Sequence, residues 1–223
     1  MMRATAADWS SGRGVSPEAI NRWTHGFGFA ASVPAAAYLF RTALSECDRQ
    51  VTVAFAVYCV ALVGLYAASA LSHAFEDRPH IRSRFRTADQ VCIYLMIAGT
   101  FTPFAAACLW TPIGIAQLVA MWVLACCGIW HRVRSRGEQV GLLDVGLCLV
   151  TGWIPVVSLA QILEVGGTDG FCLVVAGGLF YSGGTAFLMN DHRNAYLHGV
   201  WHLATLAGTG CHYLFLLNHV ACA

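Results

Sequence analysis

The sequence contains no lysine and little charge of either sign. All 13 basic residues are arginine, and only 11% of the 223 residues are charged. The absence of lysine excludes a retinal-type Schiff base, which needs a lysine amine. Hydrophobic residues make up 57% of the chain and are spread along nearly its whole length. This composition is typical of a membrane protein with several spans and leaves no room for a separate soluble domain.

Several familiar sequence signatures are also missing. The ten cysteines are scattered and include no Cys-x-x-Cys pair. We interpret them as small apolar residues within the membrane rather than as a disulfide framework. We find no phosphate-binding loop, no Ser-His-Asp arrangement and no basic surface suited to nucleic acid, so nucleic acid is not an expected partner.

Apolar runs divide the chain into seven expected transmembrane helices. The predicted fold is therefore all-α, an integral membrane bundle in which residues 1–22 form a cytoplasmic N-terminal segment, 23–218 the seven-helix domain and 219–223 a short outer tail. In the fifth run, Gly152 and Pro155 predict a kink. The expected spans are 23–43, 51–74, 88–109, 113–131, 140–161, 170–189 and 196–218.

Arginine distribution predicts the orientation of this bundle. With seven spans, 11 arginines fall on the side of the N-terminus, and only Arg41 and Arg49 fall on the other side. Loops rich in basic residues stay in the cytoplasm, so the N-terminus is expected inside and the C-terminus outside.

Histidines near one end of the predicted bundle are the strongest functional signal. His198 and His202 are four residues apart, so they share one helix face and lie about 6 Å apart along its axis. The alternating topology places His73 and Asp89 at the same cytoplasmic depth, and Ser69 shares a helix face with His73. Ionisable side chains are costly inside a membrane, so such a group suggests a functional site.

Three neutral imidazoles and one water match the open, tetrahedral site of catalytic Zn²⁺. We therefore predict that His73, His198 and His202 bind zinc, although imidazoles also accept copper and iron. Asp89 and Ser69 would act around the metal, with Asp89 accepting a proton from water. The alternative is that the histidines only form hydrogen bonds between helices. His25 is a rival ligand, but a packing role suits it better.

Five short segments carry a resemblance to a known family. They are Ser69-Ala70-Leu71-Ser72-His73, Ala88-Asp89-Gln90, Ile97-Ala98-Gly99-Thr100-Phe101-Thr102-Pro103-Phe104, Gly178-Leu179-Phe180-Tyr181 and His198-x-x-Trp201-His202. Together they resemble the hemolysin III family, which belongs with the progestin and adipoQ receptors and is more distantly similar to alkaline ceramidases. The likeness extends from about Glu18 to the last predicted helix.

This resemblance implies a seven-helix bundle with zinc held by His73, His198 and His202. It also implies that Ser69 and Asp89 lie around a zinc-bound water. Hydrolysis of a ceramide-like amide is attributed to some relatives, while others are described as receptors or membrane-lysing proteins. Two positions depart from the family pattern: Ser72 replaces the usual Tyr, and Gln90 replaces a frequent His.

The sequence thus supports one leading function and two alternatives. The leading hypothesis is a zinc-dependent hydrolase of a ceramide-like lipid amide, located in the cell membrane with its zinc toward the cytoplasm. Membrane lipids are the expected partners, and the oligomeric state is left open. The first alternative is a lipid sensor in which zinc is purely structural. The second is a pore or hemolysin, which the lack of a charge-lined span disfavours.

Overall fold

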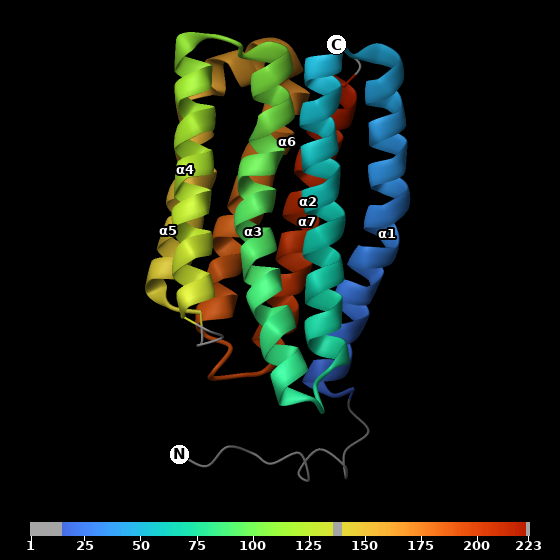
Figure 1. Cartoon of the computed structure of the whole chain (residues 1–223), viewed down its shortest axis with the longest axis vertical. Helices are drawn as coiled ribbons and strands as arrows, with labels where there is room; N and C mark the ends of the chain where they lie inside the picture. Colours follow the sequence, from blue (N-terminus) through green and yellow to red (C-terminus); the bar gives the residue numbers. More distant parts are fainter. Residues whose placement is uncertain (1–14, 136–139, 222–223) are drawn as a thin grey trace.

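The protein is a bundle of helices with no strand in its described part (Figure 1). The computed structural model describes residues 15–135 and 140–221. The predicted all-α class is confirmed over these residues. The helices are α1 (Pro17–Glu46), α2 (Arg49–Ala74), α3 (Pro79–Cys108), α4 (Pro112–Arg134), α5 (Leu142–Trp153), the 3₁₀ segment η2 (Ile154–Ser158), α6 (Leu159–Met189) and α7 (Tyr196–His219).

Side-chain caps set the starts of α1, α2 and α4. Ser16, Asp48 and Thr111 each accept a hydrogen bond from the backbone amide three residues further on. Such caps pair amides that the first helical turn would otherwise leave free. Pro17 and Pro112 then occupy the first turn of α1 and α4, where the missing N–H costs nothing. These start signals keep the connections between consecutive helices short.

Two helices begin well before the spans predicted for them. α1 begins at Pro17 instead of residue 23, and α3 begins at Pro79 instead of residue 88. A helix can extend beyond the apolar run that it contains, so hydropathy alone does not locate its first turn. As a result, Glu18 and Arg82 lie on helices and form an ion pair with each other.

The expected kink in the fifth run is present as η2. Pro155 lies in this segment, where a proline cannot donate an α-helical hydrogen bond. Gln117 of α4 supports the break by donating its side-chain amide to the Ile154 carbonyl oxygen at 3.0 Å. A second departure from helical geometry follows at Gly167, whose φ of 58° and ψ of −164° divide α6 into two helical segments.

Five described stretches are long and apolar enough to cross a membrane. They are α1, α2, α3, α4 and the continuous stretch 142–189. In four of the five stretches less than half of the most apolar window is buried inside the protein, and in α2 the buried share is 56%. The count is below the predicted seven for two reasons. The fifth and sixth runs form one continuous stretch, and four histidines make α7 less apolar.

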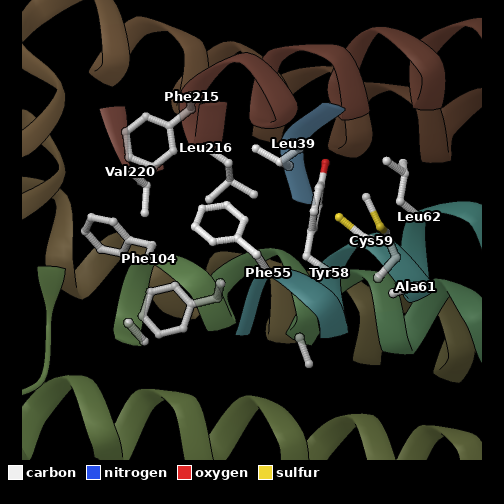
Figure 2. Packing of buried hydrophobic residues seen from close by; sticks show 14 of the residues in the cluster. Leu39, Phe55, Tyr58, Cys59, Ala61, Leu62, Phe104, Phe215, Leu216 and Val220 are labelled. Atoms are coloured by element: carbon white, nitrogen blue, oxygen red, sulfur yellow. The ribbon is translucent and has the colours of Figure 1, made fainter. Parts of the chain in front are cut away.

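Apolar packing fills one half of the bundle and leaves the other half for polar groups. α2 lies between α1 and α3, while α7 packs against α1 and α6. Leu39, Phe55, Phe104 and Leu216 are among the most buried core side chains (Figure 2). These residues come from the half in which α1 ends and α2 begins. At the opposite end, α1, α3 and α7 begin and α2 ends (Figure 1).

Candidate metal centre

Three histidines meet where the end of α2 faces the start of α7. One nitrogen atom from each of His73, His198 and His202 lies within 4.8 Å of the others. His73 and His202 are buried, and His198 is half-buried. Their ring centroids are 4.5 to 5.5 Å apart. The structure therefore brings together the three predicted ligands in a group that can hold a metal ion.

Carboxylates on the outer side orient two of the three imidazoles. His73 Nδ1 lies 2.9 Å from Glu18 Oε2, and His198 Nδ1 lies 3.0 Å from Asp191 Oδ2. An ionised carboxylate can only accept, so each Nδ1 carries the proton and donates it. In both residues, Nε2 keeps the lone pair that can bind a metal.

The third imidazole is oriented by a hydroxyl. His202 Nδ1 lies 3.1 Å from Thr24 Oγ1. This hydroxyl also lies 2.9 Å from the Ile20 carbonyl oxygen, to which it donates its own proton. Thr24 therefore accepts the Nδ1 proton of His202, and His202 also offers Nε2. Such outer hydrogen bonds are the usual support of metal-binding histidines.

The sequence analysis did not identify Glu18, Thr24 or Asp191 as part of this site. Glu18 and Asp191 were expected in polar segments outside the spans, and Thr24 is one of many hydroxyl residues in an apolar run. One available signal was their depth, since all three lie close to helix ends on the side of the histidines. Their rotation toward the site was not available without the fold.

Asp89 and Ser69 line the same cavity as the histidines and lie outside the group that can hold a metal. The Ser69 side chain lies close to the Asp89 carboxylate. Asp89 is also within electrostatic range of His198 and Arg86. Ser69 is buried one helical turn before His73. The arrangement suits a carboxylate that acts near a metal without binding it.

The two residues that depart from the family pattern also line the cavity. Ser72 donates its hydroxyl to the Ser69 carbonyl oxygen at 2.8 Å, so its side chain is bound to its own helix. Gln90 follows Asp89 and lines the cavity wall. Neither belongs to the group that can hold the metal.

A cavity of about 830 Å³ extends from the histidines into the bundle. All seven helices and η2 contribute to its lining. Its volume falls in the range of small-molecule sites. Charged and polar residues gather at the histidine end, whereas the deeper wall is largely apolar and includes Leu65, Phe101, Phe104, Met121, Ile162 and Phe215. The cavity therefore suits a molecule with a polar group at one end and a hydrocarbon chain.

His25 lies next to the metal centre but is not one of the three grouped ligands. It is 6% exposed, and its ring centroid is 3.8 Å from that of His202 and 6.1 Å from that of His73. The group within ligand distance consists of His73, His198 and His202. The structure thus places His25 in contact with His202 but outside the three-histidine group.

Comparison with known proteins decides the family. The family model described as "Haemolysin-III related" matches residues 14–213. The chain belongs to the hemolysin III family. It is similar to "Hemolysin-3" of Bacillus cereus, with 33% identity over 207 residues that cover 92% of this chain and 93% of that protein. It is also similar to "Hemolysin-3 homolog" of Bacillus subtilis (strain 168), with 30% identity over 203 residues that cover 91% of this chain and 94% of that protein.

Membership in the hemolysin III family confirms the resemblance inferred from the short motifs. The matched region contains every residue of the candidate metal centre, from Glu18 to His202. Together with the apolar helices, it identifies the chain as a multi-pass membrane protein.

Proposed function

We propose that this hemolysin III family member is a zinc-dependent hydrolase of a lipid amide. The observation that carries the proposal is that an apolar cavity begins beside three histidines that all offer Nε2. A lipid whose chain occupies the cavity would place its polar group next to the metal centre and Asp89. The supporting precedent is the ceramide-like substrate that the family resemblance implies.

The donor set fits zinc. Three neutral imidazoles with oriented Nδ1 protons form the open ligand set of catalytic zinc sites. His73, His198 and His202 would hold the ion. Bound zinc polarises a carbonyl oxygen and makes water a stronger nucleophile near neutral pH.

The residues of the chain account for binding and proton transfer. The apolar wall of the cavity holds the hydrocarbon chain and excludes bulk water. Water adds to the amide carbonyl carbon and the C–N bond breaks, which yields a carboxylic acid and an amine. Asp89 accepts the proton of the attacking water and returns it to the leaving nitrogen. The Ser69 hydroxyl keeps the Asp89 carboxylate in place for both transfers.

The proposal includes seven spans with the site near the cytoplasm. A straight helix over 142–189 would be about 72 Å long at 1.5 Å per residue, more than twice the roughly 30 Å of a bilayer core. The Gly167 kink divides this stretch into two lengths that each suit one span. α7 is then the seventh span. The arginine asymmetry supports an N-terminus in the cytoplasm, which is the end of the bundle where the histidines lie.

The deciding experiment measures metal and turnover in detergent-purified protein. We expect about one zinc per chain by plasma mass spectrometry, lost in the His198→Ala/His202→Ala double variant and retained in His80→Ala, whose histidine is exposed and outside the cavity. Asp89→Asn should retain zinc and abolish release of fatty acid from a panel of lipid amides. Asp169→Asn, an exposed acidic residue outside the cavity, should behave as wild type. Unchanged turnover in Asp89→Asn would remove Asp89 from the mechanism.

A second candidate is a lipid sensor with structural zinc. Its support is that α2 and α7 pack little against each other, although both contribute histidines. A metal would then add a second direct link between these two helices, beside the hydrogen bond from the Tyr66 hydroxyl to Thr209 Oγ1. In that case chelation lowers the thermal unfolding temperature, and no lipid amide is consumed. Membrane lysis, which the names of the Bacillus relatives describe, would instead appear as dye release from lipid vesicles.

A further inference from the structure

Asn21 and His25 present unpaired polar atoms beside the metal centre. The two residues lie four apart on α1 and therefore on one helix face. They are 5% and 6% exposed, and both line the cavity. Among described residues, Asn21 Oδ1 and both ring nitrogens of His25 have no hydrogen-bond partner. Burying such atoms without partners costs free energy, which a bound ligand would recover.

The His25 ring has two aromatic neighbours. Its centroid is 3.8 Å from that of His202 and 5.7 Å from that of Tyr66. The Tyr66 hydroxyl already donates to Thr209 Oγ1 at 2.9 Å. At Gly28, one turn beyond His25, a Cβ atom would lie 2.5 Å from the Tyr66 ring, so α1 and α2 approach closely here. His25 therefore has little freedom to find another partner in the protein.

We propose that Asn21 and His25 form a subsite that recognises hydroxyl groups next to the amide of the bound lipid. A neutral imidazole offers one donor and one acceptor, and Asn21 Oδ1 adds a second acceptor. Hydroxyl groups both donate and accept, so a lipid amide with hydroxyls near its amide pairs these atoms, whereas a plain alkyl amide does not. The subsite rests on the proposed function for its position beside the reacting group.

His25 acts in this subsite as a specificity residue and not as a fourth metal ligand. It lies outside the three-histidine group. Removing its nitrogens should therefore change lipid preference without changing zinc content. If His25 were a metal ligand, the same change would lower the zinc content. If His25 only packed against its neighbours, neither the lipid preference nor the zinc content would change.

The test compares two probes in binding titrations with zinc-loaded protein. One is the N-hexanoyl amide of a long-chain 2-amino-1,3-diol, and the other is N-hexanoyl octadecylamine, which lacks hydroxyls. We expect wild type to bind the diol amide about tenfold more tightly, the factor that one or two hydrogen bonds supply. His25→Phe and Asn21→Leu should reduce the ratio of the two affinities toward one. Both variants should keep the wild-type affinity for N-hexanoyl octadecylamine and the wild-type zinc content. His25→Gln should restore part of the ratio, and His80→Phe should leave it intact.

Three outcomes would overturn the subsite: no preference in wild type, a preference that survives both variants, or zinc loss in His25→Phe. Wild-type protein that prefers the diol amide but cleaves neither probe would refute the hydrolase proposal and leave the subsite standing. Cleavage of both amides without a binding preference would refute the subsite and support the hydrolase proposal. His25→Gln provides a folded variant for the comparison if the phenylalanine ring disrupts packing.

Discussion

At the residue scale, three oxygen atoms control what the histidines can do. Glu18, Asp191 and Thr24 each accept a hydrogen bond from the Nδ1–H of one imidazole. All three Nε2 lone pairs are then available to bind a metal ion. Glu18 and Thr24 lie on α1, which carries none of the three histidines, and Asp191 lies in the segment before α7. The geometry of the centre therefore depends on the packing of α1 as well as on α2 and α7. The site is therefore sensitive to changes outside its ligand set.

The first prediction concerns Glu18, the partner of His73. Glu18→Gln keeps the size of the side chain but replaces the carboxylate that accepts from His73 and pairs with Arg82. Zinc affinity should fall about 10- to 100-fold, as is typical when an outer hydrogen-bond partner of a ligand is lost. Competition with a chelator of known affinity measures the change.

Glu46→Gln is the matched control, because Glu46 is exposed at the other end of α1. It should bind zinc as wild type does. Equal zinc affinity in Glu18→Gln and wild type would show that the carboxylate does not support His73.

At the element scale, glycines determine how closely α6 approaches α7. Small residues such as glycine let neighbouring helices approach closely in a membrane. A Cβ at Gly184 would lie 2.8 Å from the Trp201 ring and 2.9 Å from the Ala204 Cβ, while a Cβ at Gly183 would meet nothing within 4 Å. Two neighbouring glycines therefore have different roles, which only the rotation of α6 assigns.

The second prediction uses this pair of positions. Gly184→Ala should destabilise the bundle by about 1–3 kcal/mol, because the Ala204 methyl group cannot move away without shifting α7. It should also weaken zinc binding, since α7 carries His198 and His202. Gly183→Ala should keep or raise stability, because alanine is the better helix former. Thermal denaturation in detergent measures both, and equal unfolding temperatures for the two variants would contradict the packing.

At the scale of the whole molecule, two arrangements of the helices across the membrane can be distinguished. Five stretches meet the length and composition of a span, and the proposed seven follow from the Gly167 kink and from α7. The two arrangements differ in where residues 190–195 lie. With seven spans this segment is cytoplasmic, whereas with 142–189 as one span it is outside.

The third prediction locates this segment with reporter fusions. Alkaline phosphatase, which is active only outside the cytoplasm, should be inactive when fused after Arg193 and active when fused after residue 223. Green fluorescent protein should give the inverse pattern. Fusions after Leu109 and Arg134 serve as controls, since both arrangements place the former outside and the latter inside. An active phosphatase after Arg193 would rule out the seven-span arrangement.

Local patterns in the sequence sufficed to predict the all-α class and to single out three histidines as candidate metal ligands. Apolar runs long enough to span a bilayer required helices, because backbone groups in lipid must pair within their own segment. The four-residue spacing placed His198 and His202 on one face, and alternation of spans brought His73 to the same depth. These inferences need only local periodicity and chain direction.

The surroundings of that site follow from the packing of the helices and could not be predicted from the sequence. Whether His25 joins the ligands, which oxygen orients each imidazole and where Asn21 points all depend on how each helix is rotated about its axis. Hydropathy fixes the depth of a residue but leaves this rotation undetermined when most of a helix surface is apolar. Packing of α1 against α2 and α7 sets the rotation, and with it the cavity.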